Sequence, residues 1–226
     1  MKKIKAHFLA LSVFERLTAL AIVALAATGL VLIAEGLTIK ARAAVGTVLL
    51  DRAFERALET GDAERPWPWA DTRALARVSV PRLGTSRVIL EDVSGEALAW
   101  GAGHVGGTPL PGDAGTSVLA AHRDTHFAFL GSLEAGDRVE VLRADGRLAV
   151  FIVEGRRIAR FDAPDIDVHS DTPRLVLSTC WPLDATVSGP LRLIIEAHAA
   201  EADANGPPAL TDDPHDILAG AQPQRI

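Results

Sequence analysis

Short segments of alternating polarity, spread from residue 76 to residue 199, constrain the fold of this chain most strongly. Apolar and polar residues alternate with a period of two, and Gly, Pro or Asp-Gly turns divide the segments. No long amphipathic helix separates them, so a parallel sheet of β–α–β units is not expected, and seven or eight strands at this spacing are typical of an antiparallel barrel or sandwich. The segments are residues 76–83, 86–92, 116–123, 138–145, 147–160, 174–180 and 191–199.

A charge-free run of eighteen residues, 17–34, precedes these strands and is long enough for a membrane-spanning helix. The basic residues around it are Lys2, Lys3, Lys5 and Arg16 before the run and Lys40 and Arg42 after it. This excess on the N-terminal side predicts an inner-membrane, single-pass anchor with the N-terminus inside and the following domain exported. A signal peptide cleaved near residues 41–43 is the alternative, although its apolar core usually spans only about 7 to 15 residues.

Charge divides the chain in the same place. Residues 1–42 hold six Lys/Arg and two acids, whereas residues 43–226 hold 17 Arg, no Lys and 27 acids, which gives +4 and −10. The acidic part argues against nucleic acid as a partner. We therefore predict four parts: a basic N-terminus and anchor in 1–42, a helical stalk and Trp/Pro linker in 43–75, a β-barrel in 76–200 and a mostly disordered tail in 201–226.

The stalk helix is expected to end at Gly61, with Val48, Leu49, Phe54 and Leu58 on one face. In the linker that follows, two prolines forbid a continued helix. The two tryptophans of the linker, Trp67 and Trp69, are expected to pack on the domain that follows rather than to contact substrate.

The only cysteine, Cys180, ends the strand-like segment 174–180 and is followed by Trp181 and a proline. One cysteine excludes an internal disulfide and a metal site built from several cysteines. An isolated cysteine with apolar neighbours is most often a small core residue. The chemical alternative depends on which side chains lie beside Cys180.

Strand alternation indicates which face of its segment each of three reactive side chains occupies. His122 follows Val118 and Ala120 on one face of its segment, and Cys180 follows Ser178 on another. If the last two segments form a hairpin with residue 180 opposite residue 192, Cys180 and Arg192 project from the same face. A thiol, an imidazole and a guanidinium are the groups that acyl transfer needs, namely a nucleophile, an acid/base and an oxyanion donor.

These motifs resemble those of the sortases, a family of membrane-anchored cysteine transpeptidases. The resemblance covers roughly residues 66–199 and rests on "HRDT" at 122–125, "LSTC" at 177–180 and an arginine twelve residues later. Ala121 stands where the family usually has Gly or Ser. The "PWPWADT" and "HRDTHF" segments are similar to the Gram-negative subgroup called class GN. The resemblance implies an eight-stranded sortase barrel, a groove beside Cys180, and a partner protein whose C-terminal sorting signal is the substrate.

The resemblance also implies a role for each matching residue. Cys180 matches the nucleophile, His122 the acid/base and Arg192 the arginine that holds the substrate carbonyl oxygen. Thr179 and Asp124 are expected as supporting residues. No cofactor and no metal is expected, because "HRDTH" with His126 lacks the glutamate of the metalloprotease motif.

The expected function is a transpeptidase that forms a thioester on Cys180 and transfers the acyl group to an amine acceptor, in the periplasm if the cell is Gram-negative. Two alternatives stay open at this point: a cysteine hydrolase that releases its product to water, and an envelope barrel that binds a peptide without catalysis. Arg192 also has a structural alternative, an ion pair with Glu196.

Overall fold

The computed structural model describes residues 12–187 and 189–200, and the expectations for the basic residues at positions 2–5 and for the tail after residue 200 lie outside this range. The chain divides into two compact units, residues 1–45 and 46–226. One helix, α2 (Val13–Thr60), crosses the boundary between them. The predicted anchor and the predicted stalk are therefore two parts of one helix.

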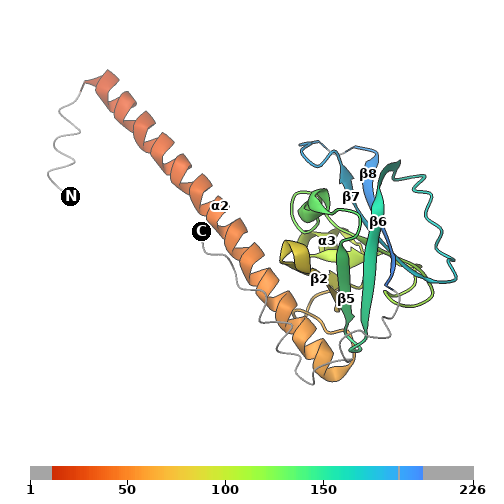
Figure 1. Cartoon of the computed structure of the whole chain (residues 1–226). Helices are drawn as coiled ribbons and strands as arrows, with labels where there is room; N and C mark the ends of the chain where they lie inside the picture. Colours follow the sequence, from red (N-terminus) through yellow and green to blue (C-terminus); the bar gives the residue numbers. More distant parts are fainter. Residues whose placement is uncertain (1–11, 188, 201–226) are drawn as a thin grey trace. The chain divides into compact units, whose positions relative to one another are not determined.

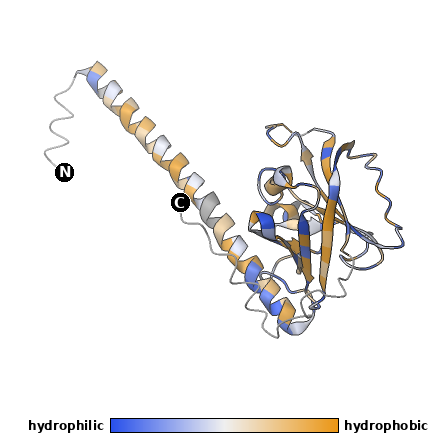
Figure 2. Cartoon of the chain, viewed as in Figure 1, coloured by the Kyte–Doolittle hydropathy of each residue, from blue (hydrophilic) through white to orange (hydrophobic). Residues whose placement is uncertain are grey.

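In the first unit, the described part of α2 is strongly apolar (Figure 2). Leu20, Leu25 and Ile33 are more than half exposed, as are most of the other large apolar side chains of this stretch. Among the described residues, α2 is the only helix that is long and apolar enough to cross a membrane. An N-terminal signal sequence can meet the same criterion of length and composition.

In the second unit, the last turns of α2 pack against the barrel. Leu50, Ala53 and Phe54 are buried and form a cluster with Val88 and Leu90 of the sheet. The expected apolar face was thus wrong in part, since Val48 is 49% exposed and Leu50 is buried in its place. The helix ends as predicted at Gly61, whose φ of 79° allows its amide to donate to the carbonyl of Ala57.

Eight strands form a closed barrel in the order β1-β2-β3-β4-β7-β8-β6-β5 (Figure 1). The mainly β fold that the sequence predicts is confirmed. The elements are β1 (Ala74–Val80), η1 (Pro81–Leu83), β2 (Thr85–Leu90), α3 (Gly95–Trp100), β3 (Ala102–His104), β4 (Gly115–Ala120), η2 (Ala128–Ser132), β5 (Arg138–Arg143), β6 (Leu148–Arg160), β7 (Pro173–Trp181) and β8 (Leu191–Ala199).

The barrel is mixed rather than antiparallel, which corrects the sequence expectation. β4 pairs with β7 in parallel, and so does β2 with the three-residue strand β3, which the sequence analysis did not identify. Residues 121–172, which contain β5 and β6, connect β4 to β7, and this long connection lets the two strands run in the same direction.

The strands of the barrel bury one face in its interior and pack the other against covering segments. Leu119, Leu177 and Leu193 belong to the interior core, which also holds Phe127 and Phe151. On the outer face of β4, β7 and β8, the adjacent positions Val118, Val176 and Ile194 form a separate small cluster. Ile166, in the loop between β6 and β7, packs against that outer cluster.

The linker between α2 and β1 is held by one of its two tryptophans. The ring of Trp67 meets the ring of Trp100 edge-on, with centroids 4.9 Å apart, whereas Trp69 is 78% exposed. Trp100 also lies against Gly46, where a Cβ atom would come within 2.5 Å of the indole ring. The prediction that the linker packs on the domain therefore holds for Trp67 and fails for Trp69.

Candidate active site

The last pair of the parallel β4–β7 ladder lies two residues before both His122 and Cys180. Ala120 pairs with Ser178, and the amide of Ala121 then donates to the carbonyl of Ser178 at 3.2 Å. His122 and Cys180 therefore both lie at the same end of the strand pair. β4 itself ends at Ala120, so His122 lies in the loop just after the strand and not within it as the sequence pattern predicted.

The antiparallel pairing of β7 with β8 places Arg192 directly opposite Cys180, as the hairpin argument expected. Arg192 pairs in turn with Ala159 of β6. Cys180 and Arg192 continue the outer-face positions of Val176 and Ile194 by an even number of residues, so both lie on the outer face of the barrel. His122 follows Val118 by four residues, beyond the end of β4.

The guanidinium of Arg192 is held in place without a carboxylate. Its Nη1 donates to the carbonyls of Gly189 and Leu191, both at 2.9 Å, and its Cζ lies 5.5 Å from the centroid of the Phe161 ring. Glu196 instead accepts a hydrogen bond from Arg157 at 2.8 Å. The ion pair between Arg192 and Glu196, the structural alternative, is therefore not formed.

Two donors of Arg192 remain available to a ligand. Within residues 12–187 and 189–200, neither Nε nor Nη2 of Arg192 has a hydrogen-bond partner. The side chains of His122 and Cys180 likewise make no hydrogen bond in that range, and His122 is exposed while Cys180 is partly exposed. The site therefore offers a reachable thiol, an imidazole and a fixed cationic donor.

The two expected supporting residues differ in their surroundings. Thr179 is buried, and its hydroxyl donates to the carbonyl of Ala121 at 2.7 Å, so it fixes the segment that leads into His122. Its hydroxyl is thus engaged on the interior side of the strand, opposite to Cys180. Asp124 is exposed, and no hydrogen bond or ion pair joins it to His122 in the described part of the chain.

Two further residues near the site were missed by the sequence analysis. Phe161 lies under the Arg192 guanidinium, and it is 59% exposed. Arg123 donates from Nη2 to the carbonyl of Val187 at 3.1 Å, which joins the loop that carries His122 to the loop between Cys180 and Arg192. The position of Arg123 next to His122 was the only available signal, and nothing in the sequence marks Phe161.

His126, four residues after His122 in the loop that follows β4, is partly buried. Burial lowers the pKa of His126, the positive charges of Arg87 and His122 lower it further, and Asp124 acts in the opposite direction. The surroundings of His126 therefore favour its neutral form. Among the described residues, no three His, Cys, Asp or Glu side chains are grouped so as to hold a metal ion.

Comparison with known proteins identifies the family. A family model described as "Sortase domain" matches residues 78–200, which is more than half of the chain. The chain belongs to the sortase family. Membership supports a transpeptidase-type function, since sortases are cysteine transpeptidases.

Individual relatives agree with this assignment. Sortase D of Bacillus subtilis is 30% identical over 118 residues, which cover 52% of this chain and 60% of that protein. This sortase thus matches less than two thirds of the length of that curated relative. A pilus-related sortase C of Group B Streptococcus is 27% identical with a TM-score of 0.51, and the match covers 57% of this chain and 68% of that one.

Sortase A from Corynebacterium diphtheriae gives a TM-score of 0.54 at 23% identity, and the match covers 61% of this chain and 65% of that one. At this identity the likeness concerns the fold alone. It confirms the eight-stranded sortase barrel expected from the sequence motifs.

Proposed function

We propose that this sortase is a cysteine transpeptidase in which Cys180 is the nucleophile, His122 the acid/base and Arg192 the oxyanion donor. The observation that supports the proposal is the strand pairing, which sets Arg192 opposite Cys180 and ends at Ala120 and Ser178, two residues before His122 and Cys180. Acyl transfer needs these three chemical groups within reach of one carbonyl.

In the first half of the reaction, the Cys180 thiolate attacks the carbonyl carbon of a peptide bond. The carbon–sulfur bond forms, and the oxyanion receives hydrogen bonds from the free donors of Arg192. The carbon–nitrogen bond then breaks, and the imidazolium of His122 gives its proton to the leaving amine. The products are a thioester on Cys180, a neutral His122 and a free amine.

In the second half, a primary amine attacks the thioester carbon. A carbon–nitrogen bond forms, the carbon–sulfur bond breaks, and sulfur leaves as the thiolate. The neutral imidazole of His122 takes the proton that the amine nitrogen loses, which restores the thiolate–imidazolium pair. Arg192 serves both halves, because its guanidinium stays charged at any working pH. The cycle balances without a cofactor.

The substrate in this proposal is a partner protein that carries a C-terminal sorting signal, and the acceptor is an amine. The apolar part of α2 anchors the enzyme in the inner membrane, with its N-terminus inside and the barrel exported. The basic excess before the apolar run supports this orientation. The Gram-negative class GN, and with it a periplasmic barrel, stays a prediction from the motifs.

The test is mass spectrometry of the full chain in detergent after mixing with a library of sorting-signal peptides. We expect one peptide class to leave an acyl mass on Cys180, and adding an amine should discharge it as the transfer product. The Cys180→Ala variant is the control and should show no adduct with any peptide.

Each other outcome identifies a different function. If the wild-type enzyme binds peptides but never forms an adduct, it is a binding barrel. If the adduct forms but gives only the hydrolysed product at every amine concentration, the protein is a cysteine hydrolase.

A further inference from the structure

Phe161 is a large apolar side chain that the core of the barrel does not use. It follows directly after the last residue of β6, and it is 59% exposed. Among the described residues, it belongs to none of the three apolar clusters. Its ring lies instead under the guanidinium of Arg192, with Cζ of Arg192 5.5 Å from the ring centroid. Burial in the core therefore does not account for this aromatic side chain.

The backbone on both sides of this contact is fixed by hydrogen bonds. Arg192 pairs with Ala159 in the antiparallel ladder of β6 and β8. The amide of Phe161 donates to the carbonyl of Pro190 at 2.9 Å, just before β8 begins. The ring and the guanidinium are therefore carried by two segments that are bonded to each other, and their contact does not depend on a free loop.

The carboxylates that lie closest to this contact in the sequence are bound by other arginines. Asp162 accepts from Nε and Nη2 of Arg160, both at 3.0 Å. Glu196 accepts from Arg157. Within the part of the chain that the structure describes, no carboxylate forms an ion pair with Arg192. The positive charge of Arg192 is therefore not compensated by an acid there.

An aromatic ring and a carboxylate hold a guanidinium in different ways. A carboxylate accepts the N–H donors in the plane of the fork and pairs with its charge. The face of a ring attracts the cation electrostatically and leaves those donors free. Stabilisation of an oxyanion needs both the donors and the charge. An arginine that is held by a ring is therefore better prepared for this role than one that is held by a carboxylate.

We propose that Phe161 is a positioning residue for the oxyanion donor, and this inference rests on the proposed transpeptidase function. The ring holds the guanidinium of Arg192 while Nη1 donates to the carbonyls of Gly189 and Leu191. Nε and Nη2 thereby keep a fixed orientation and stay available to the oxyanion. Phe161 acts through Arg192 and not on the reacting atoms.

A positioning role and a direct contact with the substrate give different kinetics. If Phe161 acts through Arg192, its loss lowers the maximal acylation rate, leaves the KM unchanged and affects every donor peptide equally. If the exposed ring instead contacts a side chain of the peptide, its loss raises the KM, and the effect depends on the peptide. The coupling between Phe161 and Arg192 separates the two roles further, because only the positioning role requires the guanidinium.

The experiment measures acylation of Cys180 by mass spectrometry, with the full chain in detergent. Two donor peptides from the adduct screen are used, which differ at the residue before the scissile bond. The variants are Phe161→Leu, Phe161→Tyr and Phe161→Glu, and Phe161→Leu is also made in an Arg192→Ala background. Trp69→Leu is the matched control, because it makes the same aromatic-to-leucine change at a ring that is 78% exposed in the linker.

We expect Phe161→Leu to lower the maximal acylation rate by roughly fivefold, the effect of losing one exposed cation–π contact, with unchanged KM and Tm for both peptides. Phe161→Tyr keeps the ring and should stay within about twofold of wild type. Phe161→Glu should lower the rate further than leucine does, because its carboxylate can take the donors that the oxyanion needs. Phe161→Leu should add nothing to Arg192→Ala, and Trp69→Leu should match the wild type.

A wild-type acylation rate in Phe161→Leu or Phe161→Glu would overturn the proposal. An effect of Phe161→Leu that persists in Arg192→Ala, or that appears in the KM for one peptide, would assign the ring to the substrate instead. An equal fall in Phe161→Tyr or Trp69→Leu would show that the contact with the guanidinium is not the cause. Absence of any thioester in the wild type would contradict the proposed function itself, before any variant is compared.

Discussion

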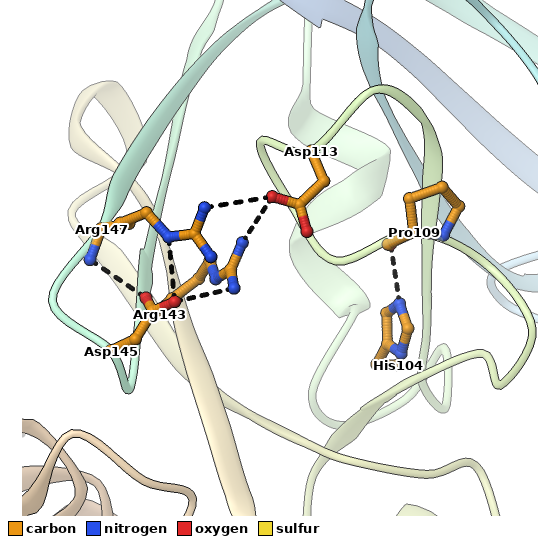
Figure 3. Close-up of polar contacts among 6 residues, drawn as sticks. All are labelled: His104, Pro109, Asp113, Arg143, Asp145 and Arg147. Atoms are coloured by element: carbon orange, nitrogen blue, oxygen red, sulfur yellow. Dashed lines mark hydrogen bonds and ion pairs between the residues drawn. The ribbon is translucent and has the colours of Figure 1, made fainter.

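The two ends of the β4–β7 strand pair use charged and polar side chains in opposite ways. At the carboxyl ends of these strands, His122 and Cys180 have side chains without hydrogen bonds in the described part of the chain, and Arg192 keeps two free donors. Near the amino end of β4, by contrast, Asp113 is paired with Arg143 and Arg147 (Figure 3).

The paired end is built around a buried arginine. The side chain of Arg143 is only 7% exposed, and it donates to Asp113 at 2.9 Å and to Asp145 at 2.7 Å. Arg147 contacts the same two carboxylates. These contacts join the β5–β6 turn to the loop that enters β4.

Because of this difference, the end of the strand pair at which a substitution lies should decide whether it lowers activity or stability. Groups whose hydrogen bonds are made within the protein contribute to stability, whereas exposed groups with free donors and acceptors are available to a substrate. Substitutions at the carboxyl ends should therefore lower activity, and the same substitutions at the amino ends should lower the melting temperature.

The largest effect is expected for histidine. His122→Ala should lower kcat/KM for transpeptidation by about 10²- to 10⁴-fold, because the leaving amine loses its proton donor. The Tm should stay near the wild-type value. In the wild type, the rate should be bell-shaped between about pH 5 and pH 10, since the reaction needs an imidazolium and a thiolate together.

His104→Ala is the matched control, because His104 lies on β3 opposite Leu119 and its imidazole is buried and hydrogen-bonded. It removes a buried imidazole from its contact with the Pro109 carbonyl, so the Tm should fall while the bell-shaped profile stays. A flat profile in the wild type under chemistry-limited conditions, or a His122→Ala variant of full activity, would contradict the role given to His122.

The second-largest fall in kcat/KM is expected for a substitution of Arg192. Arg192→Lys keeps the charge but loses the planar fork that now contacts two backbone carbonyls and the Phe161 ring. Loss of one fixed oxyanion donor typically lowers the rate by about 10²- to 10³-fold. We expect that fall in kcat/KM with an unchanged Tm. Transpeptidation at the wild-type rate would show that the oxyanion donor lies elsewhere.

The positions of the candidate active-site residues were more predictable from the sequence than the contacts between distant segments of the chain. Strand alternation has a fixed period of two, so a pairing of residue 180 with residue 192 could be tested on paper, and the structure has that pairing. The approach of His122 could not be derived in this way, because it depends on a parallel pairing between β4 and β7 across fifty-two intervening residues, 121–172. It came instead from the resemblance in the motifs.

Side-chain contacts between segments that are far apart in the chain leave no periodic pattern in the sequence. The packing of Leu50 and Phe54 on β2 depends on how the helix meets the sheet, and the contact of Gly46 with Trp100 joins residues more than fifty positions apart. The same reason applies to a cavity of about 400 Å³ whose wall comes from α2, β2 and the loop after β4. Sequence period fixes which face of a strand is buried, but not which segment covers it.

An arginine-to-lysine substitution near the amino end of β4, at Arg143, tests whether the paired groups contribute to stability rather than to activity. In Arg143→Lys, one ammonium group replaces a fork that reaches Asp113 and Asp145 together, and one of the two carboxylate contacts of this buried arginine is lost. Loss of a hydrogen bond to a charged group costs about 1.5 to 3 kcal/mol, so thermal unfolding should occur several degrees lower. The kcat/KM should remain that of the wild type. A fall in activity at unchanged Tm would remove the proposed division between the two ends.

The smallest effect is expected at Asp137, whose buried carboxylate accepts hydrogen bonds from Arg82 and from the backbone amide of Glu134. The hydrogen bonds from Arg82 hold the pKa of Asp137 below its usual value, although burial acts in the opposite direction. A carboxyl group with a lowered pKa in the folded state stabilises the fold above its unfolded pKa of about 3.9, and this contribution is lost as the pH falls through the folded value.

Asp137→Asn should therefore lower the Tm by a few degrees at pH 7, and the gap to wild type should close as the pH falls below about 4. Asp162→Asn is the matched control, because Asp162 also pairs with an arginine, Arg160, but at the surface. Exposed pairs contribute little to stability, so its Tm should follow the wild type at every pH. Thermal unfolding of the three proteins across this pH range makes the measurement. A gap for Asp137→Asn that stays constant down to about pH 2 would show that the carboxylate contributes through its shape and packing, and that its charge, like the charge of Asp162, adds nothing.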